Sequence, residues 1–334
     1  MIYIYNESTD PYYNLAAEEY LLYHKREPAF MLWVNRDVIV VGRNQNTMAE
    51  INYEYVQEAG IAVVRRLTGG GAVFHDKGNL NFTFITKEQE ENSGKTENAF
   101  VFFGNMIIGA LATLGLDASL SGRNDLEIDG RKFSGTALTV YRGYVLHHGT
   151  LMLNIAVDTL SKALRVSPQK IEGKGVKSVR SRVTNLNEHL DAPIEIPQLV
   201  EAISAFIRTQ YPDIQHYELT PEDHAAISRL VDEKYRKWEW NYGASPKYNF
   251  SKDTKYPGGT VQARMCVRDG LIEEVRFFGD YFGKREISEI EQRLVGVRHE
   301  ASAITAAIAT ASEGIPVGEY FLGADADDVA GFLA

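Results

Sequence analysis

Apolar runs separated by short polar turns predict several strands along the chain. We expect strands at Ile2 to Tyr5, Ala29 to Val34 and Val38 to Val41, with the last two joined as a buried hairpin. Leu80 to Ile85 and Tyr144 to Ile155 predict two further strands. Other segments carry apolar residues at the spacing of a helix face, and we expect helices at Pro11 to Leu22, Tyr53 to Glu58, Thr96 to Leu114, Ile196 to Thr209 and Pro221 to Lys234.

A change of composition from Arg236 to Pro246, aromatic at first and then turn-rich, predicts a domain boundary. We therefore divide the chain into residues 1–243 and a small domain of residues 244–334. The small domain is expected to be α+β, with helices at about 286–296 and 299–311. Its three antiparallel strands are expected at Tyr248 to Tyr256, Gly259 to Arg268 and Leu271 to Phe278, with Asp269-Gly270 as a hairpin turn.

The composition narrows the classes of function. The chain has 334 residues and a net charge of −10, which disfavours general binding to nucleic acid or to an anionic membrane. Its one cysteine, Cys266, excludes an internal disulfide and a CxxC zinc site and suits a reducing compartment. The amino terminus lacks the pattern of a signal peptide, and the longest apolar stretch is too short to span a bilayer, so we expect a cytoplasmic protein.

Three consecutive glycines, Gly69 to Gly71, lie between two apolar runs and predict a tight loop between strands. Bare glycine backbone lets an anion approach its N–H groups, and the guanidinium groups of Arg65 and Arg66 match phosphate or carboxylate oxygens. The loop has neither the closing GK[ST] of a P-loop nor the GxGxxG spacing of a dinucleotide fold. Because a triple glycine is more often a flexible turn, the hypothesis of an anion site depends on its flanks, which are Arg65, Arg66, His75, Asp76 and Asn79.

Asp129-Gly130 is the dipeptide favoured in a type I′ hairpin. Side chains alternate along the strand that follows, so Lys132 and Ser134 share one face while Arg131 and Phe133 share the other. If Phe133 points to the core, Lys132 points toward the open face of the sheet.

Two further features remain ambiguous from the residues alone. The adjacent His147 and His148 point to opposite faces of a strand, so at most one lines a site, and a hydrogen-bonded structural role is the more common one. Residues 162–182 carry many lysines and arginines against one acid, Glu172. This block fits a solvated basic face, a lid that closes over phosphates, or a docking site for an acidic partner.

Four motifs in order give the chain a specific resemblance: RRLTGGGAVFHD, GRNDLEIDGRKFSGTA, HHGTLMLN and KGVKSVRSRVTNL. They resemble the two-domain bacterial lipoate-protein ligase A family, and the likeness covers essentially the whole chain. The family often has serine at the position of Thr68, which retains the hydroxyl. The resemblance implies an α+β fold, with a mixed-sheet catalytic domain similar to those of biotin-protein ligases and class II aminoacyl-tRNA synthetases.

The resemblance also implies an activity. Members of the family activate lipoate with ATP, usually with Mg²⁺, to give lipoyl-adenylate and pyrophosphate, and then transfer the lipoyl group to a lysine of an apo lipoyl domain. The acceptors expected by resemblance are the E2 subunits of 2-oxoacid dehydrogenases and the glycine cleavage H protein. The residues leave open whether lipoate or octanoate is preferred, and which residues bind Mg²⁺.

Carried over to this sequence, the family pattern makes Lys132 the catalytic residue, where the lipoate carboxylate, the α-phosphate and the attacking amine meet. Lys174 to Arg182 would form a lid over the adenylate, and apolar side chains such as Val73 and Phe74 would line a tunnel for the aliphatic chain. For His75 and Asp76 an acid–base pair and loop-bracing hydrogen bonds both stay open. The expected contacts to ATP and lipoate are Arg66, Gly71, Ala72, Val73, Phe74, His75, Asp76, Asn79, Asn124, Asp125, Lys132, His148, Gly149 and Lys174.

Three other interpretations compete with the ligase. A lipoyl or octanoyl transferase of the same fold would need a thiolate, for which Cys266 in the small domain is a poor candidate. A non-enzymatic binding module or regulator is disfavoured by the acidic charge, and a paralogue that depends on a partner protein is a further alternative. We also expect the small domain to swing about a hinge at Trp238 to Tyr242.

Overall fold

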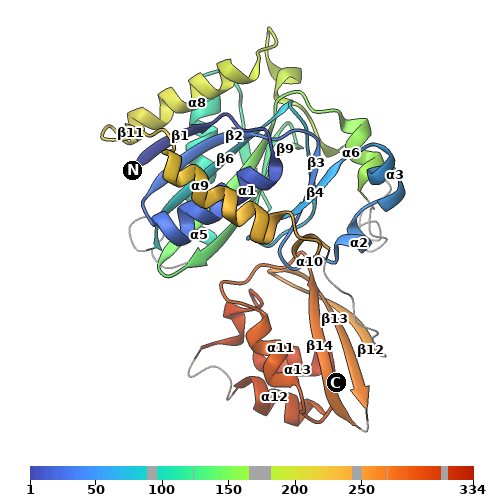
Figure 1. Cartoon of the computed structure of the whole chain (residues 1–334). Coiled ribbons are helices and arrows are strands. Elements are labelled where there is room, and N and C mark those ends of the chain that lie inside the picture. Colours follow the sequence, from blue (N-terminus) through green and yellow to red (C-terminus); the bar gives the residue numbers. More distant parts are fainter. Residues whose placement is uncertain (89–95, 123, 165–181, 243–249, 269, 310–314) are drawn as a thin grey trace. The chain divides into compact units, whose positions relative to one another are not determined.

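The computed structural model describes residues 1–88, 96–122, 124–164, 182–242, 250–268, 270–309 and 315–334 (Figure 1). Contacts divide the chain into two compact units. The first contains Met1–Val41, Met48–Arg65 and Val73–Asn241, and the second contains Gly42–Thr47, Arg66–Ala72 and Tyr242–Ala334. The glycine loop therefore belongs by its contacts to the unit that includes the carboxy-terminal domain.

An eight-stranded mixed sheet forms the centre of the first unit, in the order β11-β1-β2-β6-β10-β9-β8-β7. β1 pairs in parallel with β11 and β2, and the other neighbouring strands are antiparallel. This confirms the predicted α+β class with a mixed sheet. The strands are β1 (Ile2–Asn6), β2 (Ala29–Val34), β6 (Asn79–Lys87), β7 (Ser119–Ser121), β8 (Asp125–Ile128), β9 (Arg131–Tyr141), β10 (Tyr144–Met152) and β11 (Gln215–His216).

Helices cover both faces of this sheet. On one face α5 packs against α8, and on the other α1 packs against α9 and η4 (Figure 1). Two neighbouring residues of β10 point to opposite faces of the sheet. His147 stacks on Phe103 of α5, while His148 contacts Glu18 of α1. The bounds are α1 (Pro11–Glu19), η1 (Tyr20–Lys25), α5 (Thr96–Ala112), α8 (Ile196–Gln210), α9 (Pro221–Leu230), η4 (Val231–Tyr235) and α10 (Trp238–Asn241).

Local signals in the sequence account for several ends and turns. The Asp10 side chain caps α1 by accepting a hydrogen bond from the Tyr12 N–H at 3.1 Å, and Pro11 opens the helix, as predicted. Asp129 and Gly130 both have positive φ, 50° and 70°, which is the conformation of the predicted type I′ hairpin. These predictions are confirmed.

The predicted hairpin of Ala29–Val34 with Val38–Val41 is wrong, although both strands exist. β3 (Val38–Val41) pairs in parallel with β4 (Ala62–Arg65) and antiparallel with β5 (Val73–His75) in a separate three-stranded sheet. The link between β2 and β3 contains Asn35, which is fully buried and accepts a hydrogen bond from Asn14 at 2.9 Å. Because both strands are buried, the apolar pattern did not say which sheet each one joins. Short helices nearby are α2 (Thr47–Glu50), α3 (Tyr53–Glu58) and α6 (Val157–Ala163).

The carboxy-terminal domain has its own core. Its sheet has the predicted antiparallel order β12-β13-β14, and Met265, Phe277 and Leu294 are buried between the sheet and the helices. α13 was not predicted, and Asp269 of the predicted turn lies outside the described residues. The elements are β12 (Phe250–Tyr256), β13 (Gly259–Arg268), β14 (Leu271–Gly279), α11 (Ser288–Leu294), α12 (Ala301–Ala309), η6 (Val317–Glu319) and α13 (Ala326–Leu333).

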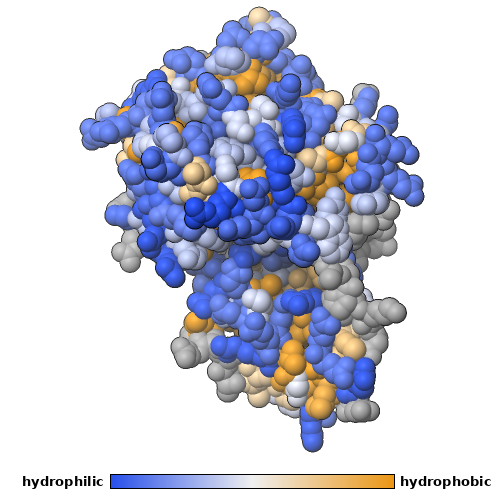
Figure 2. Space-filling view, viewed as in Figure 1, coloured by the Kyte–Doolittle hydropathy of each residue, from blue (hydrophilic) through white to orange (hydrophobic). Residues whose placement is uncertain are grey.

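The face drawn in Figure 2 is largely hydrophilic, with apolar side chains in scattered spots. Exposed large apolar residues such as Tyr53, Val101 and Trp238 are ordinary for a folded chain when they are dispersed. None of the helices in the described part of the chain has the length and apolar character needed to cross a bilayer.

Candidate functional site

Lys132 lies on β9 directly after the type I′ turn. Its Nζ is 2.7 Å from Oδ1 of Asp125 on β8, and each side chain is about one-third exposed, at 34% and 33%. Phe133, the next residue, is fully buried. The predicted contrast between Lys132 and Phe133 is therefore confirmed, and it places a charged amine on the open face of the hairpin. Strict alternation does not continue along the strand, because the pairing with β8 shifts between Leu126 and Glu127, and Ser134, predicted on the Lys132 face, is fully buried.

Asn124 braces the strand that carries Lys132. Its Nδ2 donates to the Thr136 carbonyl oxygen at 2.5 Å, and its own carbonyl oxygen accepts from the N–H and hydroxyl of Thr136. Asn124 and Asp125 thus flank the beginning of β8, where both were predicted to contact the ligand.

Arg66 folds back on the glycine loop. Its Nε donates to the Thr68 hydroxyl at 2.9 Å, and its Nη2 donates to the carbonyl oxygens of Gly69 at 2.6 Å and Gly71 at 2.9 Å. Gly70 has φ of +87°, which favours glycine. The guanidinium therefore stabilises the loop in this arrangement, and the hydroxyl retained at Thr68 takes part in it.

The glycines of the loop also contact the carboxy-terminal domain within the second unit. A Cβ on Gly69 would lie 2.5 Å from the Tyr281 carbonyl oxygen, and one on Gly70 would lie 3.4 Å from the Phe282 ring. The Gly279 N–H donates to the Asn44 carbonyl oxygen at 2.7 Å. In this structure the glycine backbone packs against Tyr281 and Phe282 of the same unit. The sequence pattern did not distinguish such packing from ligand binding.

Arg65 was predicted to flank an anion site at the glycine loop, but its guanidinium binds carbonyl oxygens near the end of the first unit. Its Nε donates to the Trp240 carbonyl oxygen at 2.8 Å and its Nη2 to that of Asn241 at 3.2 Å. Burial lowers the pKa of its guanidinium to about 10. Adjacent residues of an extended chain face opposite ways, so Arg65 and Arg66 diverge.

These contacts also fix the connector that was expected to act as a hinge. Residues Trp238–Asn241 form the short helix α10, and the Asn241 side chain accepts from the Arg65 N–H at 2.9 Å. Asn241 further donates to the Tyr235 carbonyl oxygen. These contacts hold residues 238–241 within the first unit, and the swing of the small domain about this connector stays a prediction.

His75, Asp76 and Asn79 form hydrogen bonds to the chain around them. His75 Nδ1 is 3.1 Å from Asn35 Nδ2, and Asn79 donates to Asn81 at 2.9 Å. Asp76 accepts from the N–H groups of Gly78 and Ala156, each at 2.8 Å. The sequence left open whether Asp76 is part of an acid–base pair or stabilises its loop by hydrogen bonds. These contacts favour stabilisation of the loop.

The two adjacent histidines have different surroundings, as expected from their opposite faces. His147 is fully buried and stacks on Phe103, and burial lowers its pKa to about 3. His148 Nδ1 is 2.8 Å from Oε1 of Glu18, which also accepts from the Thr83 hydroxyl at 2.6 Å. The next residue, Gly149, leaves room for the Phe82 ring, which would lie 2.5 Å from an added Cβ.

Glu18 was not among the predicted site residues, although it is almost fully buried. The sequence contained a signal for it, because Leu15, Glu18 and Leu22 follow the spacing of one helix face. A carboxylate on an apolar face requires a partner, and His148 is that partner.

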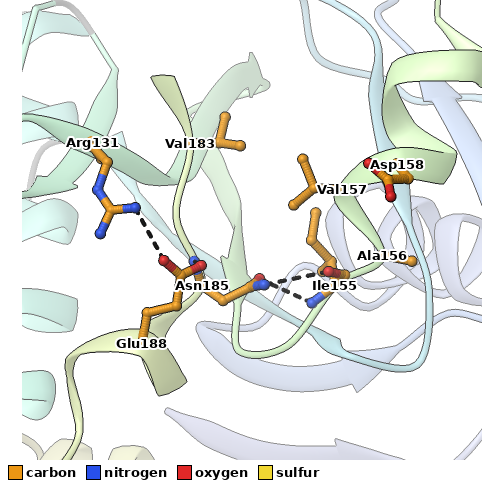
Figure 3. A pocket seen from close by; sticks show the side chains of 8 residues that line it. All are labelled: Arg131, Ile155, Ala156, Val157, Asp158, Val183, Asn185 and Glu188. Carbon is orange, nitrogen blue, oxygen red and sulfur yellow. Dashed lines mark hydrogen bonds and ion pairs between the residues drawn. The ribbon is translucent and has the colours of Figure 1, made fainter. Parts of the chain in front are cut away.

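A cavity of about 480 Å³ lies beside the Lys132 strand (Figure 3). Its lining combines apolar residues from the chain after β10 with polar residues from β9 and from η3 (Leu186–His189). Figure 3 shows Arg131 directed toward Glu188 at one side of this cavity. The lining residues are Arg131, Ile155, Ala156, Val157, Asp158, Val183, Asn185 and Glu188.

Contacts bring some predicted residues together. Lys132 meets Asp125 in the first unit, and Arg66 meets Gly71 in the second. Phe74 is buried in β5, while Val73 and Ala72 are partly exposed. Lys174 and most of the predicted lid lie outside the described residues, and Arg182, the described end of the lid, is exposed. Cys266 lies on β13, with Sγ 3.6 Å from Glu273.

Two family models match the chain. Residues 10–208 match "Lipoyl protein ligase A/B catalytic domain", and residues 245–333 match "Bacterial lipoate protein ligase C-terminus". The chain belongs to the lipoate-protein ligase family. The predicted family and the predicted class of enzyme, a ligase, are therefore confirmed.

Relatives of this ligase family match over nearly their whole length. Lipoate-protein ligase LplJ of Bacillus subtilis is 43% identical over 326 residues, covering 96% of each chain. Lipoate–protein ligase 1 of Staphylococcus aureus is 44% identical over 305 residues, covering 91% of this chain and 92% of its own.

Solved ligase structures share the fold. P. falciparum LipL1 in complex with lipoate has a TM-score of 0.78 at 24% identity, covering 92% of this chain and 94% of its own. Lipoate-protein ligase A bound with ATP has a TM-score of 0.63 at 25% identity, covering 72% and 98%. A bipartite ligase from Thermoplasma acidophilum, described with its E2 lipoyl domain, has a TM-score of 0.65 at 27% identity, covering 75% and 98%.

Proposed function

We propose that the chain catalyses ATP-dependent lipoylation in two steps. In the first, an oxygen of the lipoate carboxylate attacks the α-phosphorus of ATP, a C–O–P anhydride forms and pyrophosphate leaves. In the second, a lysine amine of an acceptor protein attacks the acyl carbon, an amide forms, AMP leaves and the amine loses its proton. The observation that carries the proposal is the Lys132 amine on the open face of its hairpin, in a chain that matches ligases over nearly its full length.

Lys132 is proposed to stabilise the charge of both reacting groups. A fixed ammonium lowers the barrier when negative charge builds on the phosphate oxygens during attack. Asp125 holds the amine at 2.7 Å and orients it. The anionic oxygens of ATP and lipoate would then compete with Asp125 for the same ammonium.

The remaining predicted residues are proposed to bind the substrates. Arg66, Gly71, Ala72, Val73 and Phe74 would contact nucleotide and lipoate, and burying each methylene of lipoate in an apolar tunnel is worth about 0.8 kcal/mol. His148 and Gly149 on β10 are proposed to contact the ligand as well, as is Lys174. His75, Asp76 and Asn79 are proposed to hold the chain that follows β5 in place, in accord with their hydrogen bonds.

Mg²⁺ is proposed to accompany ATP. The carboxylate of Asp125 and the side-chain amide oxygen of Asn124 are hard oxygen ligands of the type that Mg²⁺ takes beside phosphates. The described residues contain no group of three or more His, Cys, Asp or Glu side chains that could hold a metal by themselves. These two residues therefore fit an ion held in part by the nucleotide, where it would neutralise phosphate charge.

The acceptors are proposed to be apo lipoyl domains, in E2 subunits of 2-oxoacid dehydrogenases and in the glycine cleavage H protein. The T. acidophilum ligase described with its E2 lipoyl domain supports this class of partner. We keep residues 1–243 as the proposed catalytic domain and residues 244–334 as the proposed accessory domain.

The test is an ATP-dependent gain of mass on several apo lipoyl domains, each offered lipoate and octanoate separately. A gain equal to one lipoyl group that requires ATP supports the proposal, and transfer without ATP contradicts it. Cys266→Ser should keep full activity, since the ligase chemistry uses no thiol. Loss of activity in that variant would favour the transferase.

A further inference from the structure

The end of β9 that carries Lys132 is held by a segment from later in the chain. β10 pairs with β9 from Tyr144–Tyr141 to Gly149–Thr136, so this ladder stops before Lys132. Val183 forms a parallel bridge with Lys132, and the Thr184 N–H donates to the Lys132 carbonyl oxygen at 2.9 Å. The backbone of Lys132 is thus fixed by β8 on one side and by this segment on the other.

The same segment is anchored to the chain that leaves β10. The buried Asn185 side chain accepts from the Ile155 N–H at 2.9 Å and donates to the Ile155 carbonyl oxygen at 3.3 Å, as Figure 3 shows. Because one side-chain amide binds both the N–H and the carbonyl oxygen of Ile155, it fixes the position and the orientation of the segment that carries Asn185.

A further interaction with this segment involves Arg131, the neighbour of Lys132. Arg131 Nη1 donates to Oε2 of Glu188 at 3.0 Å (Figure 3), and Oε1 of Glu188 accepts from the Asn185 N–H at 3.1 Å. His189 Nε2 is 2.9 Å from the Thr184 hydroxyl, which closes the turn. Glu188 therefore joins the hairpin to the segment through one carboxylate.

We propose that residues 183–189 form a clamp that positions Lys132, and that Glu188 is a positioning residue acting through Arg131. This proposal rests on the proposed function, because Lys132 must have a catalytic role for its position to affect the rate. The ion pair is partly exposed, 36% at Arg131 and 46% at Glu188, and such pairs add little to stability. A shift of about 1 Å in a catalytic group can cost about 10²-fold in rate, so the clamp should affect rate more than folding.

The experiment measures pyrophosphate release, with lipoate and ATP varied separately, for Glu188→Ala and Glu188→Gln. Glu188→Ala should lower kcat about 10-fold to 100-fold, while the KM values and the melting temperature stay near wild type. Glu188→Gln should recover part of kcat, because its single amide oxygen can still accept either from Arg131 or from the Asn185 N–H, although not from both. The control is Asp253→Ala, which removes a partly exposed pair of the small domain, Arg264 with Asp253 at 2.7 Å, and should leave kcat unchanged.

Lys132→Ala, assayed in parallel, separates this proposal from the proposed function. Normal pyrophosphate release by Lys132→Ala would contradict the catalytic role itself. If Lys132→Ala is inactive while Glu188→Ala works at the wild-type rate, the catalytic role stands and the clamp is overturned. A fall in kcat matched by a fall in melting temperature, without recovery in Glu188→Gln, would also overturn the clamp, since it would show a structural role.

Discussion

Two glycine-marked turns, the hairpin at Asp129-Gly130 and the loop at Gly69 to Gly71, carry similar signals in the sequence but use glycine differently. In the hairpin the positive φ of both turn residues directs the chain so that Lys132 reaches the open face. In the loop Gly69 lies against the Tyr281 carbonyl oxygen, and Arg66 occupies the carbonyl oxygens of the loop itself. A glycine run therefore indicates that another group packs closely against the backbone. Whether that group is a ligand or another part of the protein depends on the surrounding fold.

The largest effect on stability is expected at the buried side of the hairpin. Phe133→Ala should lower the free energy of unfolding by about 3–5 kcal/mol, because a fully buried ring is replaced by a cavity. Lys132→Ala, one position away and partly exposed, should change it little. Urea unfolding of the two variants measures this difference, and equal losses would contradict the burial of Phe133 beside an exposed Lys132.

The loop is tested by filling the space that its glycine leaves. Gly69→Ala should destabilise the carboxy-terminal unit by about 1–3 kcal/mol, because the new methyl group meets backbone that cannot rotate away. Gly331→Ala is the control, since nothing lies within 4 Å of its added Cβ, and an alanine in α13 should stabilise the chain by about 0.5–1 kcal/mol. Thermal unfolding should separate the two variants, and a Gly69→Ala protein as stable as wild type would refute the packing role.

Acid should weaken the sheet beneath the hairpin, because β9 pairs with β10 and His147 is buried there. Burial lowers the pKa of His147 to about 3, so between that value and the ordinary 6.5 the unfolded chain binds a proton that the folded chain excludes. The contribution of this histidine to the free energy of unfolding is therefore complete above about pH 6.5. It decreases as the pH falls toward 3, by about 1.4 kcal/mol for each pH unit. His147→Phe should flatten the acid side of a stability-versus-pH curve, and an unchanged slope would contradict this account.

The smallest effect is expected from the ion pair between Arg43 and Glu286 in the carboxy-terminal unit. The pair is partly exposed, so Glu286→Gln should cost no more than about 1 kcal/mol, and less as salt is added. Unfolding of the variant and wild type at low and high salt measures this. A large cost that is insensitive to salt would mean that the pair contributes more to the packing of the loop than its exposure implies.

The sequence predicted most strands and helices and the contrast between Lys132 and the buried Phe133, because period-two and helical patterns, Asp-Gly turns and a capped Asp10-Pro11 start are local properties. The irregular pairing that buries Ser134 was not predicted. It did not predict that Val38–Val41 leaves the main sheet, since a strand buried on both faces has no preferred partner in its own sequence. Arg65 and Arg66 had the same local signal, yet one turns to Trp240 and the other to the loop. The direction in which each arginine points depends on the assembled fold, and the Trp240 carbonyl oxygen that binds Arg65 is distant from it in the sequence.

Glu18 shows that part of the unpredicted site did have a local signal. Its position between Leu15 and Leu22 on one helix face predicts burial, and burial of a carboxylate requires a partner such as His148. The clamp at residues 183–189 had no such signal, because its contacts with Lys132 and Arg131 join segments far apart in the sequence.

The most direct test of the central claim measures the first step of the reaction in Lys132→Ala. Pyrophosphate release from ATP and lipoate is measured in a single turnover and set beside wild type, with the fold checked by circular dichroism. We predict a loss on the order of 10²–10³-fold, the size found when a charge-stabilising donor is removed from an active site. Pyrophosphate release at the wild-type rate by a correctly folded Lys132→Ala protein would contradict the assignment of Lys132.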